Sequence, residues 1–142
     1  MASWLRQYCI WVTDIEETIK FYETIGLECT ARTEITADVK EAMIENPERG
    51  AWIQLAQNTK QEGPIDMGTS TWKLYVYTDD IQGIYDAAMA AGYKSVSEPA
   101  KAQRWPTTIA FIEDPDGYQV ELVQRDEPAQ VGGAGGSPRD QF

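Results

Sequence analysis

Four polar side chains occupy matching places in two repeated segments of the chain: Gln7 and Gln54 in the first, Lys73 and Glu121 in the second. Glu121 is a carboxylate that can accept and move a proton, whereas Lys73 is a cation that can polarise a carbonyl group or hold an anion. The two glutamines add neutral amide groups for hydrogen bonds. The four side chains are expected to converge, and the set predicts a site for a carbonyl-bearing or anionic small molecule, with Lys73 and Glu121 as the catalytic residues.

Large aromatic side chains share the strand faces of these residues. A surface rich in aromatics with a few polar groups is typical of a ligand pocket. Burial in a dimer accounts for the aromatics equally well, and a solvated sheet face accounts for the polar residues, so the alternatives stay open. Besides Gln7 and Gln54, the predicted ligand-binding residues are Trp11, Trp52, Tyr75, Tyr77, and Arg104 and Trp105 in the loop before the last hairpin.

The composition narrows the chemistry. The chain has no histidine, which excludes histidine general bases and every histidine-ligated metal site. Two cysteines make no disulfide framework, and Cys9 is expected to line the pocket because no histidine can activate it as a nucleophile. A net charge of −11 argues against nucleic acid or a membrane as partner. With no signal peptide and no apolar run of about 20 residues, a cytoplasmic location is expected.

Alternating strands and capped helices must position these side chains. Asp14 and Gly26 mark the start and the end of one helix, and Asp80 and Gly92 mark a second. The two sets lie about 66 residues apart, which indicates an internal duplication. In each copy the pattern predicts a strand, then a helix, then three strands. The strands are expected at 7–12, 27–35, 39–45 and 52–57, and again at 73–78, 93–97, 107–112 and 118–124.

The domain organisation follows from the duplication. A length of 142 residues is enough for one domain with its own core. We expect a single domain over residues 1–125, with module one at 5–58, a polar linker at 59–71 and module two at 72–125. The Gly-rich segment 126–142 is expected to be a flexible tail, because it has too little apolar surface to bury.

Two segments resemble a known family. They are Val12-Thr-Asp-Ile-Glu-Glu-Thr-Ile-Lys-Phe-Tyr22, with Gly26-Leu27 after it, and Ile109-Ala-Phe-Ile-Glu-Asp-Pro-Asp-Gly-Tyr-Gln-Val-Glu-Leu122. Both are similar to the vicinal oxygen chelate superfamily, which includes glyoxalase I (lactoylglutathione lyase), ring-cleaving dioxygenases and bleomycin resistance proteins. The resemblance implies an α+β fold in which two tandem βαβββ modules form a curved mixed sheet around a cleft, usually in a homodimer.

The resemblance also implies where a metal would bind. Metal-dependent members place one ligand on each of four strands, and the corresponding residues here are Gln7, Gln54, Lys73 and Glu121. Gln7 and Glu121 match ligands that the family uses, whereas Gln54 and Lys73 do not. An ammonium has no lone pair for a metal until it loses its proton, at a pKa near 10.4. We therefore expect no cofactor and no metal residues, and Gln54 and Lys73 disfavour a divalent metal.

Three functions fit these residues. The first is a glyoxalase-like small-molecule protein with a degenerate metal site, which carries out metal-independent binding or isomerase or lyase-type chemistry on a carbonyl or anionic compound. The second is a metal-dependent enzyme like lactoylglutathione lyase. The third is a non-enzymatic, resistance-type protein that sequesters a ligand. The sequence leaves open whether the chain is an enzyme.

Overall fold

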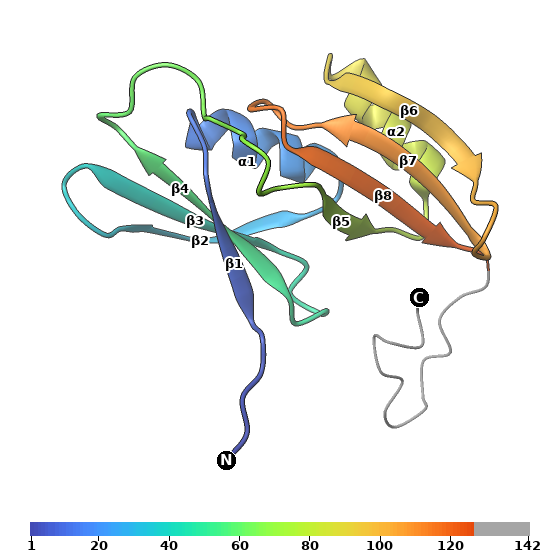
Figure 1. The fold of residues 1–142 in the computed structure, drawn as a ribbon, viewed down its shortest axis with the longest axis horizontal. Helices are drawn as coiled ribbons and strands as arrows, with labels where there is room; N and C mark the ends of the chain where they lie inside the picture. Colours follow the sequence, from blue (N-terminus) through green and yellow to red (C-terminus); the bar gives the residue numbers. More distant parts are fainter. Residues whose placement is uncertain (127–142) are drawn as a thin grey trace.

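A computed structural model describes residues 1–126, so the tail expected from 126 onward lies outside the described residues except for Asp126. The chain is α+β and repeats one strand, one helix and three strands (Figure 1). The elements of the first module are β1 (Gln7–Trp11), α1 (Ile15–Thr24), β2 (Glu28–Glu34), β3 (Val39–Glu45) and β4 (Trp52–Asn58). Those of the second are β5 (Leu74–Tyr77), α2 (Ile81–Ala90), β6 (Lys94–Lys101), β7 (Thr107–Glu113) and β8 (Gln119–Arg125).

The two modules have the same topology, which confirms the predicted pair of βαβββ units. Each forms a four-stranded mixed sheet, in the order β1-β4-β3-β2 and β5-β8-β7-β6. The first strand of each module runs parallel to the last, and the remaining pairs are antiparallel. The registers correspond as well: Cys9 faces Gln54 in one sheet, and Tyr75 faces Glu121 in the other.

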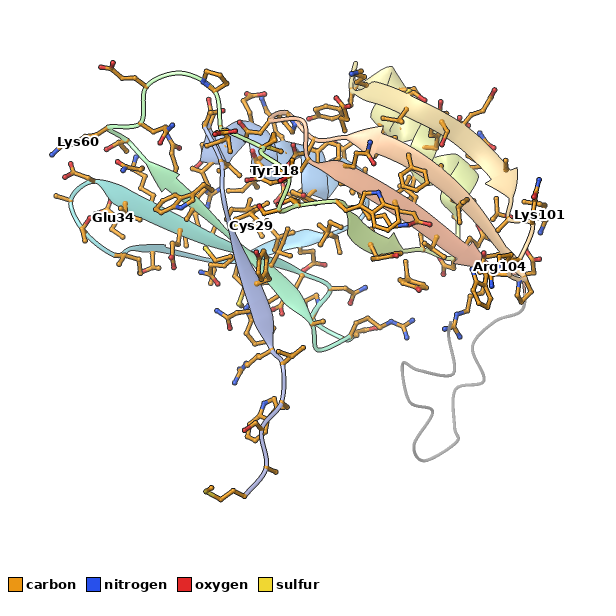
Figure 2. All side chains as sticks on the ribbon, in the orientation of Figure 1. Cys29, Glu34, Lys60, Lys101, Arg104 and Tyr118 are labelled. Carbon is orange, nitrogen blue, oxygen red and sulfur yellow. The ribbon has the colours of Figure 1, made fainter. Side chains whose placement is uncertain are left out.

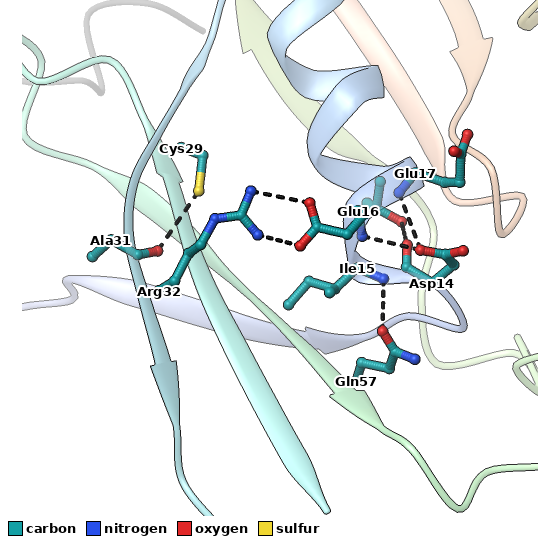
Figure 3. A network of polar contacts seen from close by, with 9 residues as sticks. Asp14, Ile15, Glu16, Glu17, Cys29, Ala31, Arg32 and Gln57 are labelled. Carbon is teal, nitrogen blue, oxygen red and sulfur yellow. Dashed lines mark hydrogen bonds and ion pairs between the residues drawn. The ribbon is translucent and has the colours of Figure 1, made fainter.

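Both helices begin as the sequence predicts, and a glutamine supports each start. The Asp14 carboxylate accepts from the amides of Glu16 and Glu17, and the Asp80 carboxylate accepts from the amide of Gly83. Gln57 Oε1 also accepts from Ile15 N at 2.9 Å (Figure 3), and Gln124 Oε1 accepts from Ile81 N at 2.8 Å. The last strand of each module therefore caps its own helix, because these acceptors satisfy amides that have no partner within a helix.

The core lies between each helix and its sheet and is continuous across the modules. Its largest fully buried side chains include Phe21 and Tyr22 of α1 and Leu122 of β8. Among the described elements, α1 against α2 is the contact between secondary structures that joins the modules. The sheets splay apart on either side of it (Figure 1). Within residues 1–126, neither helix is long and apolar enough to cross a bilayer.

The turn Asp114–Tyr118 adds a polar bridge between the modules. Tyr118 lies at the seam between the sheets (Figure 2), and its hydroxyl donates to the Trp11 carbonyl at 2.7 Å. The Asp116 carboxylate accepts from Thr13 Oγ1 at 2.5 Å and from the Thr13 amide. The turn within the second family-like segment therefore also connects the second module to the first.

The strands match the predicted bounds within one residue at each end except at the end of β6, and two of the differences matter here. β6 continues past residue 97 to Lys101, through Pro99, because it is an edge strand whose outer amides need no partner. Irregular register after Ser95 and Ser97 interrupts the alternation that would have indicated this length. β5 begins at Leu74, so Lys73 stands directly before the strand.

Candidate functional site

Lys73 and Glu121 form an ion pair on the concave face of the second sheet. The Lys73 Nζ lies 2.5 Å from Glu121 Oε2, and the side chains are only 12% and 9% exposed. Glu121 lies on β8 between two apolar residues that point to the core, Val120 and Leu122. The angles of the contact are poor for a hydrogen bond, so the attraction is chiefly between the charges.

Aromatic rings surround the Lys73 ammonium. Its Nζ lies 4.2 Å from the ring centre of Trp72, 4.8 Å from that of Tyr75 and 5.3 Å from that of Phe111. Burial lowers the pKa of Lys73, but the contacts with Glu121 and Tyr75 outweigh it and hold the pKa above its ordinary value. The ammonium is therefore protonated at neutral pH, and ring faces stabilise its charge.

In the first module, the two predicted glutamines also contact each other. Gln7 Nε2 donates to Gln54 Oε1 at 3.3 Å, and Gln54 Nε2 donates to Glu41 Oε2 at 3.2 Å. Sequence reasoning missed Glu41, which lies on β3 beside β4 and points to the same face as Gln54. The alternation of residues 39–45 could have revealed it. The first module thus carries a neutral amide pair and a carboxylate where the second carries an ion pair.

The structure does not bring all four predicted residues together. No hydrogen bond or ion pair within residues 1–126 links the Gln7–Gln54 pair to the Lys73–Glu121 pair. In this part of the chain the backbone of no strand of one sheet runs beside a strand of the other. The expected convergence is therefore not found within one chain, because the modules meet through their helices and splay their concave faces apart.

The predicted aromatic residues lie on the concave faces but are not enclosed. Trp11, Tyr75 and Tyr77 remain 45% to 51% exposed. Trp52 is half-buried, with the Arg6 guanidinium 4.6 Å from its ring centre. Arg104 and Trp105 are exposed in the β6–β7 loop, with the guanidinium 5.5 Å from the ring centre. The roles of these residues in ligand binding stay predictions.

Two hollows lie at the seam between the modules. One, of about 290 Å³, is lined by Met67, Thr71, Trp72, Gly117, Tyr118 and Gln119. The other, of about 70 Å³, is more enclosed, and Tyr8, Tyr22, Lys73 and Tyr118 are among its lining residues. Lys73 thus lies between the seam and the concave face of the second sheet.

Cys9 and Arg125 complete the residues of interest on the concave faces. Burial and the nearby Glu41 raise the pKa of the Cys9 thiol, which disfavours the thiolate that a nucleophile needs. Sequence reasoning missed Arg125 at the end of β8, whose guanidinium lies 5.9 Å from the ring centre of Tyr77. Its position at the end of a strand gave no indication in the sequence that it belongs to a site.

The side chains do not fit the divalent metal that the family resemblance implies. Lys73 places a protonated ammonium directly on Glu121, and the remaining oxygens at the corresponding positions belong to two glutamines in the other module. Amide oxygens and one carboxylate already paired with a cation make a poor donor set for zinc or for a hard cation. Within residues 1–126, no three side chains of His, Cys, Asp or Glu are grouped to hold a metal ion.

Comparisons with known proteins agree with the fold. The sequence profile of the Glyoxalase/Bleomycin resistance protein/Dioxygenase superfamily matches residues 4–122. A probable lactoylglutathione lyase of Vibrio parahaemolyticus is 33% identical over 118 residues, covering 80% of this chain and 84% of that protein. The lactoylglutathione lyase of Haemophilus influenzae is 30% identical over 117 residues, with 80% and 86% covered.

A solved structure gives the same result. Glyoxalase I from Zea mays superposes with a TM-score of 0.76 at 28% identity, over 84% of this chain. This chain spans only 44% of the maize protein, which is therefore more than twice the length of the matching part. The profile match over most of the chain and the repeated βαβββ topology together show that this chain belongs to the Glyoxalase/Bleomycin resistance protein/Dioxygenase superfamily.

Proposed function

We propose that the chain binds a small carbonyl-bearing or anionic compound without a metal and that Lys73 and Glu121 act on it directly. The observation that carries the proposal is the shielded Lys73–Glu121 ion pair at positions where metal-dependent relatives would need metal ligands. A protonated ammonium held among aromatic rings is an electrostatic substitute for a metal cation. The relatives named lactoylglutathione lyase support a lyase or isomerase type of chemistry.

The pair offers one donor and one acceptor for such chemistry. The Lys73 ammonium has three N–H groups, and those not directed at Glu121 can donate to a carbonyl oxygen. That donation stabilises the negative charge that develops when a proton leaves the neighbouring carbon. Glu121 is the carboxylate within reach to take up that proton and return it. Proton transfer next to a carbonyl group is therefore the reaction that the pair supports.

Hydrogen exchange on a small ketone tests this activity. We expect the protein to accelerate exchange of the protons next to the carbonyl group of hydroxyacetone in heavy water, followed by NMR. Lys73→Met and Glu121→Gln should each abolish the acceleration. Exchange that persists unchanged in Lys73→Met would refute the proposed catalytic pair. If no exchange occurs but ligands bind, the sequestering function expected from the aromatic residues is the better description.

Folding must be controlled in this experiment, because Lys73→Met leaves the Glu121 carboxylate shielded from water without its cation. The double variant Lys73→Met/Glu121→Gln removes both charges and should recover thermal stability relative to Lys73→Met alone. It should still fail to catalyse exchange. A stable double variant without activity separates loss of the catalytic groups from loss of the fold.

The names of the relatives favour a second candidate, a metal-dependent lactoylglutathione lyase. It predicts lactoylglutathione lyase activity that disappears with a chelator and returns with an added divalent ion. Elemental analysis of protein purified without a chelator or histidine tag adds a direct readout. About one equivalent of metal per chain would favour this candidate over the metal-independent one.

We also propose that the protein acts as a homodimer, as the family resemblance implies. Trp11, Trp72, Tyr75 and Tyr77 leave large apolar surface exposed beside both polar pairs. Exposed aromatic surface next to polar groups is typical of an interaction site. A second copy that covers these faces would also cover the side of the sheet that carries the Lys73–Glu121 pair.

A further inference from the structure

We propose that Arg125 is the carboxylate-binding residue of the site and that the ligand is a planar organic acid about one ring in length. The inference rests on the proposed function, because it identifies the class of compound that reaches Lys73. Two observations support it. The Nη2 atom of the Arg125 guanidinium has no acceptor among residues 1–126. Two tyrosines, Tyr75 and Tyr77, lie between this guanidinium and Lys73.

The surroundings of Arg125 leave its charge available. Its Nη2 is buried and donates to no acceptor in the described part of the chain, where no carboxylate lies at ion-pair distance either. The adjacent Asp126 is already paired with Lys101. Leaving a guanidinium N–H without an acceptor costs free energy when water is excluded. A ligand oxygen at this nitrogen would remove that cost.

The position of Arg125 connects it to the proposed site. By strand alternation its side chain lies on the same face of β8 as Glu121. It reaches over Tyr77, just as Lys73 reaches over Tyr75. Tyr75 and Tyr77, here called the tyrosine strip, are 45% and 47% exposed and alternate on β5. Side chains two residues apart on a strand are separated by roughly 7 Å, about the length of a substituted benzene ring.

The charges around the tyrosine strip indicate that the ligand carries a single carboxylate. Lys73 is neutralised by Glu121, so among the described residues the strip offers one positive charge without an ion-pair partner, at Arg125. A single guanidinium matches a single carboxylate through two parallel N–H bonds. The Lys73 end then takes a neutral oxygen, such as a ketone. Arg104 lies at the same end of the second sheet as Lys101 (Figure 2), and the backbone of its loop is bonded to the end of β8 by Asp126 N and Pro106 O at 2.9 Å. The loop that carries Arg104 therefore meets the end of the strand that carries Arg125.

Calorimetric titration of the full chain with 4-acetylbenzoate and with its neutral isostere, 4-acetylbenzamide, tests the inference. The acid carries a carboxylate and a ketone on opposite ends of one ring. We expect the acid to bind the unmodified protein at least tenfold more tightly than the amide. Arg125→Gln should lower the affinity for the acid to that of the amide and leave the amide unchanged. Arg125→Lys, which keeps the charge but not the paired N–H groups, should lose part of the preference.

Arg49→Gln is the matched control, because Arg49 is an exposed arginine in the first module with no ion pair among residues 1–126. It should bind both compounds like the unmodified protein. Equal affinity of acid and amide, binding of neither, or an unchanged preference in Arg125→Gln overturns the inference. Lys73→Met separates this result from the proposed function, since it should weaken acid and amide together. If Lys73→Met has that effect and Arg125→Gln has none, the catalytic pair stands and the carboxylate position does not.

Discussion

Asp114 is the buried residue with the clearest effect on how stability depends on pH. It is 5% exposed, and its Oδ1 accepts from the amides of Asp116 and Tyr118, both at 2.9 Å. Its other oxygen and the hydroxyl of Tyr22, which faces it, are buried without a hydrogen-bond partner of good geometry in the described residues. Burial raises the pKa of Asp114 to about 7, although the backbone amides oppose the shift. Nothing in the sequence around Asp114 indicated this change in its protonation.

The expected consequence is a protein that loses stability as the pH rises toward 8. In an unfolded chain the pKa of aspartate is about 3.9, so between about pH 4 and pH 7 the folded state holds the extra proton. The free energy of unfolding therefore falls as the pH increases through this range, by at most about 1.4 kcal/mol per pH unit from this group. Thermal unfolding from pH 5 to pH 8 measures the slope.

Asp114→Asn should flatten this pH dependence and raise the melting temperature at pH 8. An asparagine keeps the oxygen that accepts the two turn amides, cannot ionise, and offers an N–H toward Tyr22. Asp79→Asn, at an exposed position, serves as the control and should leave the slope as it is. An unaltered slope in Asp114→Asn would show that another group causes the pH dependence.

At the scale of elements, the two helices end on equivalent glycines in different surroundings. Gly26 and Gly92 have φ values of +92° and +87°. An alanine at either position would therefore lower stability by about 1–2 kcal/mol, because a Cβ disfavours the left-handed backbone conformation. A Cβ at Gly26 would also lie 3.2 Å from Ile84 Cδ1 of α2, whereas a Cβ at Gly92 would have nothing within 4 Å. We expect Gly26→Ala to lower the melting temperature more than Gly92→Ala.

The cause of that difference can be isolated with Ile84→Val, which removes the Cδ1 atom. In this background the two alanine variants should have equal effects, because only the shared backbone strain remains. Equal melting temperatures of Gly26→Ala and Gly92→Ala in the unmodified background would contradict the contact. Ile84 packs against the core, so it has little freedom to move away.

The elements themselves were largely predictable from the sequence, because their signals are local. Asp14 and Gly26, with their counterparts Asp80 and Gly92, fix the helix ends within a few residues. Alternation placed Lys73 and Glu121 on one face. Contacts between strands were harder to predict, because Glu41 reaches Gln54 only once β3 and β4 are in register.

The arrangement of the two modules relative to each other could not be predicted from local sequence patterns. The alternation placed the polar pair of each module on the correct face. It also predicted that Gln7, Gln54, Lys73 and Glu121 converge, which the structure does not show within one chain. Their separation depends on how α1 packs against α2 and on the bonds from Asp116 and Tyr118 to the first module. Those contacts are tertiary, and no spacing in the sequence specifies the angle that they impose.

At the scale of the whole molecule, the exposed concave faces predict association with a second copy. Each chain carries a net charge of −11, so two copies repel each other and apolar contact must drive the association. Trp11 is the central test, because it is 51% exposed on β1 and only its backbone carbonyl bonds to Tyr118. A charged side chain there would meet the partner surface without disturbing that bond.

Sedimentation velocity should therefore find a dimer for the unmodified protein and a monomer, or at least tenfold weaker association, for Trp11→Glu. Ile35→Glu is the matched control, because Ile35 is 57% exposed and follows β2, at the opposite edge of the same sheet from β1. It should remain dimeric. If the unmodified protein is monomeric, or if Ile35→Glu dissociates the dimer while Trp11→Glu does not, the concave faces are not the interface. In that case the aromatic residues beside Lys73 are left to contact a ligand alone, and the site must act from within one chain.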